Sequence, residues 1–212
     1  EKLTDKNGQP LTGKGVIIGD VDSGIDVFHP MFFFADGGEF TFTDVDGDGK
    51  LTIGEDGIDL NSNGTIDAGE VIRYQEIADN TWGMLGSMGQ QSGKYNPEFD
   101  FLYIDVNGNK KRDFGPAAGF KESDPTYGEQ YFIAIDNNKD GKVEAGEKLV
   151  GLKTSKVRSV RQRDDVIRRR GVDLIMTEED KNGHGTGVAG LIIGGHYGVQ
   201  KIHGIAPDAE MV

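Results

Sequence analysis

The chain has 212 residues and a formal net charge of −13, and only 35% of its residues are apolar. So acidic a chain is repelled by nucleic-acid backbones and by anionic membranes, which argues against both as partners. The absence of cysteine excludes disulfides and thiolate metal sites. No stretch approaches the roughly 18 apolar residues of a membrane span. Since the chain begins at Glu1 without a signal-like segment, we expect a processed product whose targeting information has been removed.

An apolar run in the N-terminal zone, residues 1–42, leads directly into an acidic turn. Residues 16–21 predict a buried strand, and Asp22, Ser23 and Gly24 follow it. In parallel α/β sheets, ligands and catalytic groups gather at the ends of strands. Taken alone, however, Asp22 is equally well explained by an ordinary Asx turn.

The middle zone, residues 43–170, alternates short β-like runs with loops rich in Asp, Asn and Gly. Strand candidates at or near this zone are residues 40–42, 99–104 and 131–135, so we expect it to be mostly β. Its last part, residues 148–170, is basic, and we interpret it as a solvated face or a linker.

The C-terminal zone, residues 171–212, returns to an α/β pattern. Residues 172–176 are a strand candidate, and a polar turn leads from them into a helix predicted from His184 to about Gly194. The several glycines of that helix each cost about 1 kcal/mol relative to alanine. Close packing explains so many glycines better than helix stability does.

A twelve-residue calcium loop is predicted at residues 44–55. Oxygen-bearing side chains stand at positions 1, 3 and 5, glycine at position 6 permits the sharp turn, and glutamate at position 12 can bind through both oxygens. Calcium takes about six to eight oxygen ligands, which explains why the spacing matters. The expected ligands are Asp44, Asp46, Asp48, Glu55 and the backbone carbonyl of Lys50.

The same pattern is complete in two further loops, at residues 59–70 and 136–147. In the first of these the expected ligands are Asp59, Asn61, Asn63, Thr65 and Glu70. In the second they are Asp136, Asn138, Asp140, Lys142 and Glu147.

A fourth acidic stretch, which begins at Asp105, departs from the pattern. Lys110 stands where glycine is expected, and Pro116 stands at position 12. A shorter loop with Asp113 as a direct ligand is the alternative that remains. Its candidate ligands are Asp105, Asn107, Asn109, Lys111 and Asp113.

Segments rich in Asp, Asn and Gly are often ordinary turns, but three complete matches in one chain favour calcium binding. Because the loops follow strand-like runs, we expect calcium-binding hairpins or strand–loop units in place of paired helical EF-hands. Carboxylates within a loop repel one another until a cation neutralises them. We therefore expect the middle zone to be poorly ordered without calcium.

Two segments resemble the motifs of the subtilase family of serine proteases. Residues 15–30, in which an apolar strand runs into Asp22-Ser23-Gly24-Ile25, are similar to the family's catalytic-Asp motif. Residues 182–190 are similar to its His-Gly-Thr-His-Val-Ala-Gly motif, and residues 204–210 to the stretch that follows. The resemblance implies that Asp22 and His184 are the catalytic Asp and His.

The resemblance also implies the fold class, which is α/β. We expect residues 1–42 and 171–212 to form part of a subtilisin-like three-layer core with a parallel sheet, and residues 43–170 to be a mostly β, calcium-binding insertion. Gly187 replaces the second His of the motif, which is not the general base. The 162-residue separation between Asp22 and His184 is unusually long for the family, and the insertion accounts for it.

The family order of catalytic residues is Asp, His, Ser, and the chain ends before any Gly-Thr-Ser-type segment or oxyanion Asn. We therefore expect a truncated catalytic domain that needs its C-terminal remainder as a partner and is inactive alone. The resemblance implies that the parent enzyme is a secreted endopeptidase acting on polypeptides.

Two other interpretations stay open. The chain could be a calcium-dependent binding or adhesion module on a non-catalytic scaffold, or the insertion could simply stiffen a long loop against autolysis. Calcium-rich loops suit a secreted, periplasmic or cell-surface location. Asp26 and His29 are expected to shape the turn after Asp22, and His196 and His203 to be surface or packing residues.

Overall fold

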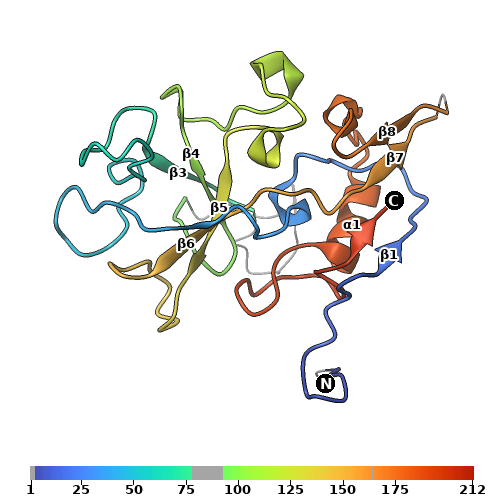
Figure 1. Cartoon of the computed structure of the whole chain (residues 1–212), viewed down its shortest axis with the longest axis horizontal. Helices are drawn as coiled ribbons and strands as arrows, with labels where there is room; N and C mark the ends of the chain where they lie inside the picture. The colour runs from blue at the N-terminus through green and yellow to red at the C-terminus, as the bar shows by residue number, and fades with distance from the viewer. Residues whose placement is uncertain (1–2, 78–92, 164) are drawn as a thin grey trace.

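The computed structural model describes residues 3–77, 93–163 and 165–212. Strands β1 and β9 and helix α1 lie together at one end, and strands β3, β4, β5 and β6 form a larger sheet beside them (Figure 1). Parallel and antiparallel strand pairs occur together with the helix, which confirms the α/β class. Within the described residues, no helix has the length and apolar character that a membrane crossing requires.

The parallel sheet joins segments from both ends of the chain. Strand β1 (Ile17–Ile18) pairs in parallel with β9 (Glu210–Met211). On the other side of β9, Val157 forms a parallel bridge with Met211, and the N–H of Met211 donates to the carbonyl of Lys156 at 2.9 Å. The segment around Val157, which comes from the middle of the chain, therefore joins the sheet formed by β1 and β9.

The middle of the chain forms a five-stranded antiparallel sheet in the order β2-β6-β5-β4-β3. Its strands are β2 (Glu39–Phe40), β3 (Ile72–Gln75), β4 (Phe101–Ile104), β5 (Tyr131–Ile135) and β6 (Lys148–Gly151).

Both faces of this sheet are buried. On β4, Phe101 and Tyr103 belong to the core shared with α1 and β9, whereas Leu102 and Ile104 point into a second core on the opposite face. Successive strand residues point to opposite faces, so burial of both faces explains why this strand is apolar throughout.

The helix predicted near His184 is confirmed as α1 (His184–Ile193), which buries Ala189 and Ile193 in the shared core. The strand predicted at residues 172–176 is wrong, because Leu174–Met176 form the short 3₁₀ helix η4. The Glu122 carboxylate accepts the N–H groups of Gly171 and Ile175, both at 2.9 Å, and so closes the turn. A short apolar run does not by itself distinguish a strand from a helical turn.

The remaining elements connect these layers. The basic segment contains β6 and a hairpin, so it is partly regular structure and not simply a linker. The hairpin strands are β7 (Ser159–Arg161) and β8 (Ile167–Arg169), and the other 3₁₀ helices are η1 (Pro30–Phe32), η2 (Pro116–Ala118) and η3 (Pro125–Tyr127).

Candidate active site and calcium loops

Folding brings Asp22 and His184 into direct contact across 162 residues of sequence. Asp22 lies in the turn after β1, and His184 is the first residue of α1. The Nδ1 atom of His184 lies 2.7 Å from Oδ1 and 2.9 Å from Oδ2 of Asp22. The Asp22 side chain is 18% exposed and the His184 side chain is 67% exposed, so the imidazole faces solvent while its partner sits behind it.

The two groups shift each other's pKa. The hydrogen bond from His184 lowers the pKa of Asp22, with help from the N–H of Ser23, and the same hydrogen bond raises the pKa of His184. A carboxylate at Nδ1 selects the tautomer with a proton on that nitrogen. The Nε2 atom is then free to accept a proton from an incoming hydroxyl.

Gly185 permits the close approach of α1 to the Asp22 turn. A Cβ atom at this position would overlap the carbonyl oxygen of Gly24 and lie 3.1 Å from the Cβ of Asp22. Gly187, two residues later, is different, because a Cβ there would meet no atom within 4 Å. The contact between Asp22 and His184 therefore requires glycine at position 185 but not at position 187.

Asp180 is a site residue that the sequence analysis missed. Its Oδ1 accepts the hydroxyl of Ser23 at 3.1 Å, and its Oδ2 accepts the N–H of Thr186 at 3.0 Å and the Thr186 hydroxyl at 2.9 Å. The Ser23 hydroxyl in turn accepts the N–H of Gly185 at 3.0 Å. Asp180 thus joins the Asp22 turn to the start of α1. An acidic residue just before a predicted helix was the available signal.

Asp26 and the histidines other than His184 have structural contacts. Asp26 accepts the N–H of Phe28 at 3.0 Å, and the ring of His29 accepts the N–H of Met31 at 3.4 Å. His196 is buried, with Nε2 at 2.9 Å from the carbonyl oxygen of Phe33, and burial lowers its pKa to about 4. His203 is exposed, and its Nδ1 lies 2.8 Å from the carbonyl oxygen of Gly204.

The family model described as "Subtilase family" matches residues 13–212. This chain belongs to the subtilase family. No curated protein and no solved structure matches it. Subtilases are serine peptidases, and the segments around Asp22 and His184 lie within the matched range.

In this subtilase chain, the four acidic loops share one backbone conformation. In each, the N–H at position 6 donates to the carboxylate at position 1. The distances are 2.8 Å from Gly49 to Asp44, 2.8 Å from Gly64 to Asp59, 2.9 Å from Gly141 to Asp136 and 3.0 Å from Lys110 to Asp105.

The fourth loop adopts this conformation although Lys110 replaces glycine. The φ angle of Lys110 is +66°, in the left-handed region where Gly49 has +81° and Gly141 has +81°. The side chains at positions 3 and 5 also accept N–H groups two residues later in all four loops. These side chains are Asp46, Asp48, Asn61, Asn63, Asn107, Asn109, Asn138 and Asp140.

In the first three loops, a carboxylate at or just after position 12 accepts the N–H groups at positions 2 and 9. Glu70 and Glu147 do so in the second and third loops, at distances of 2.7 to 3.1 Å. In the first loop the structure differs from the prediction, because Glu55 is exposed and the buried Asp56 accepts Val45 at 2.8 Å and Thr52 at 2.7 Å. Asp56 stands one residue after position 12. Its side chain is shorter than that of glutamate, but it accepts the same two N–H groups.

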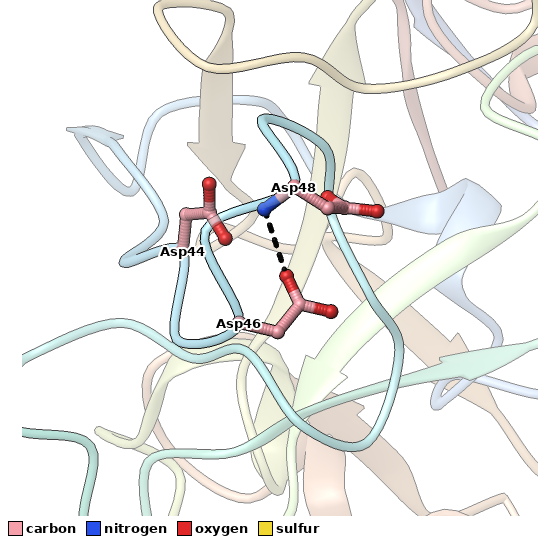
Figure 2. Close-up of side chains that lie close together, drawn as sticks. All are labelled: Asp44, Asp46 and Asp48. Carbon is pink, nitrogen blue, oxygen red and sulfur yellow. Dashed lines mark hydrogen bonds between the residues drawn. The ribbon is translucent and has the colours of Figure 1, made fainter.

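The donor chemistry of the first loop fits a hard cation. Carboxylate oxygens of Asp44, Asp46 and Asp48 all lie within 4.8 Å of one another, and Figure 2 shows the three side chains around one turn of the loop. The dashed line there is the 3.1 Å hydrogen bond from the N–H of Asp48 to Asp46. Oxygen-rich sites of this kind suit calcium. At position 7 the side chains of Lys50, Thr65, Lys111 and Lys142 are exposed, which leaves the backbone carbonyl as the predicted ligand.

Two of the loops are coupled directly. The N–H of Leu51 donates to the carbonyl of Val143 at 2.8 Å, and the N–H of Ala145 donates to the carbonyl of Gly49 at 2.9 Å. Leu51 and Val143 both stand at position 8 of their loops. The first and third loops therefore pair through their backbones without flanking helices.

Proposed function

We propose that this chain is part of a secreted serine endopeptidase in which Asp22 and His184 are two members of a catalytic triad. The observation that carries the proposal is the contact of 2.7 Å between Nδ1 of His184 and Oδ1 of Asp22. Membership in a family of serine peptidases supports it. The nucleophilic serine, in this proposal, comes from residues that follow this sequence, as the family order requires.

The mechanism is acyl transfer. The Nε2 atom of His184 takes the proton of the serine hydroxyl as the oxygen attacks the carbonyl carbon of the peptide, and it then delivers that proton to the leaving amine. Asp22 holds the imidazole in the required tautomer and stabilises the imidazolium that forms. The exposed ring of His184 leaves room for the serine and the substrate.

The domain organisation forms part of the proposal. Residues 1–42 and 171–212 belong to the catalytic domain, which its C-terminal remainder completes, and residues 43–170 are a calcium-binding insertion. The pairing of β2 with β6 supports starting the insertion earlier, before residue 39, and the pairing of Val157 with Met211 supports ending it earlier, before residue 156. Calcium bound in the loops would neutralise their carboxylates and fix the loop backbone, and it would take no part in the bond cleavage.

A serine-directed fluorophosphonate probe tests the peptidase assignment. We expect the full-length protein to be labelled, a His184→Ala variant to react at least 100-fold more slowly, since general base catalysis contributes typically that much, and the 212-residue chain alone not to be labelled. Equal labelling of wild type and variant would contradict the assignment of His184. Absence of labelling in the full-length protein would favour the non-catalytic binding module.

A further inference from the structure

The loop that begins at Asp105 contains a buried carboxylate oxygen without a hydrogen-bond partner. Asp105 is 1% exposed, and its Oδ2 accepts the N–H of Lys110 at 3.0 Å and lies 3.5 Å from Nε of Arg73. Its Oδ1 has no partner among the residues that the structure describes. Buried polar atoms are nearly always satisfied, and leaving one unpaired costs about 1–3 kcal/mol.

Glu129 takes the place in this loop that a position-12 glutamate takes in the second and third loops. Its Oε1 accepts the N–H of Val106 at 2.7 Å and its Oε2 accepts the N–H of Asp113 at 2.9 Å. These donors are positions 2 and 9 of the loop. In the third loop, Glu147 accepts the N–H groups of the same two positions, also at 2.7 and 2.9 Å. Glu129 lies 24 residues after Asp105, so it is outside the twelve-residue window.

Asp113 has a different part in the loop. Its Oδ2 accepts the amide groups of Asn107 at 2.5 Å and Asn109 at 2.7 Å. In the second loop, Asp67 accepts the amides of Asn61 and Asn63 in the same way. An Asn side chain that donates through nitrogen presents its oxygen elsewhere. Asp113 therefore fixes the orientation of the two amides, whose oxygens accept the N–H groups of Asn109 and Lys111.

We propose that this loop binds a fourth calcium ion, held by Asp105, by Asn107, Asn109 and the carbonyl of Lys111, and by Glu129 from outside the loop. Each carboxylate oxygen has about two acceptor sites, so both oxygens of Glu129 can contact the ion while accepting one N–H each. The unpaired Oδ1 of Asp105 also gains a partner. The mixture of carboxylate, amide and carbonyl oxygens suits calcium better than magnesium, which keeps several of its waters.

The site lies between two adjacent interior strands of the antiparallel sheet. Asp105 directly follows β4, and Glu129 stands two residues before β5. Arg112, within the loop, donates to the carbonyl of Glu129 at 3.0 Å and lies over the ring of Tyr131, 3.8 Å from its centroid. In this proposal, the ion links the end of β4 to the residues just before β5. The inference does not depend on peptidase activity.

Counting calcium bound to the full chain, by equilibrium dialysis with metal analysis, tests this site. We expect Glu129→Gln to lose one equivalent per chain relative to wild type. Glu122→Gln is the matched control, because Glu122 also accepts two backbone N–H groups but lies outside the acidic loops. It should keep every equivalent. An unchanged count in Glu129→Gln would overturn the proposal.

Two further variants separate this result from misfolding and from a failure of the other loops. Asn107→Ala removes an exposed ligand, so it should lose the same equivalent while far-UV circular dichroism stays native. Glu147→Gln should lose an equivalent from the third loop. Loss in Glu147→Gln but in neither Glu129→Gln nor Asn107→Ala would refute the fourth site alone. No bound calcium in wild type would refute calcium binding by all four loops. Neither result affects the peptidase assignment, which the serine-directed probe tests separately.

Discussion

Lys156 and Ile193 tie the end of the antiparallel sheet to the end of the helix that begins with His184. The Nζ atom of Lys156, which is fully buried, donates to the carbonyl oxygen of Ile193 at 2.9 Å and to that of Gly195 at 2.6 Å. Carbonyls at the C-terminus of a helix lack intrahelical partners and attract a donor or a cation. The segment that follows β6 therefore supplies hydrogen-bond donors to the carbonyls at the end of α1.

The contribution of Lys156 to the free energy of unfolding should rise with pH between about 7 and 10.5. Burial lowers its pKa from 10.5 to about 7, opposed by the charge of Asp208, so in this window the unfolded chain holds a proton that the folded chain lacks. One such proton contributes at most about 1.4 kcal/mol per pH unit. His196, which is buried nearby with its pKa lowered to about 4, is neutral throughout the window. Urea unfolding at several pH values measures the slope.

The matched variants are Lys156→Met and Lys153→Met, since Lys153 is an exposed lysine three residues earlier. Relative to wild type, the first should reduce the slope of the free energy of unfolding against pH between pH 7 and 10.5, and the second should leave that slope unchanged. Parallel curves for Lys156→Met and wild type would show that Lys156 is charged in the folded state.

The sequence predicted those parts of the fold that local pattern determines. Residues 131–135 were expected as a strand and form β5 with those bounds, and the glycine-rich segment after His184 forms α1. The strand expected at residues 172–176 failed because a long-range partner, Glu122, closes a helical turn there. No window around Leu174 contains that information.

In the candidate sites, too, the features set by local sequence were predicted and those set by long-range contacts were missed. The spacing of acidic residues predicted where the four loops of shared backbone conformation lie, since such a loop is local in sequence. Glu129 was missed because it lies outside its loop, and Asp56 was missed because one extra residue shifts the register. Asp180 was missed because its role depends on the meeting of two distant segments, which only the folded chain brings together.

Replacing Asp22 should lower the pKa of His184. The hydrogen bond with Asp22 is the largest cause of its raised pKa, so Asp22→Asn removes both the charge and the strongest acceptor. Asp20 contributes least, and Asp20→Asn should shift the titration by a smaller amount. Titration of the imidazole protons by NMR measures both.

The contact between Asp22 and His184 also makes the free energy of unfolding depend on pH. The pKa of His184 is raised in the folded state, so its contribution is present below pH 6.5 and is lost as pH rises through the raised value. Asp22→Asn should therefore destabilise the chain more in mildly acidic solution than at pH 9. Equal destabilisation at both pH values would argue against this coupling.

Alanine at two neighbouring glycines should have opposite effects. Gly187→Ala places a methyl group in open space within α1 and should stabilise the chain by about 0.5–1 kcal/mol, because glycine is a poor helix former. Gly185→Ala overlaps the carbonyl of Gly24 and should destabilise by about 1–3 kcal/mol. Denaturant unfolding gives both values. Gly185→Ala should also move the His184 titration toward that of Asp22→Asn, whereas Gly187→Ala should not.

Removal of calcium should lower the melting temperature through the loops, and Asp56 and Glu55 provide the sharpest comparison. A site held at about 100 times its dissociation constant stabilises the folded state by about 2.7 kcal/mol, which corresponds to roughly 5–10 °C in a chain of this size. Since Asp56 accepts two loop N–H groups and Glu55 is exposed, Asp56→Asn should reduce the shift between calcium and chelator, and Glu55→Gln should preserve it. Thermal unfolding followed by circular dichroism measures the shift. If Glu55→Gln were the variant that lost it, the twelve-residue register would be correct and the arrangement around Asp56 would not describe the loop with calcium bound.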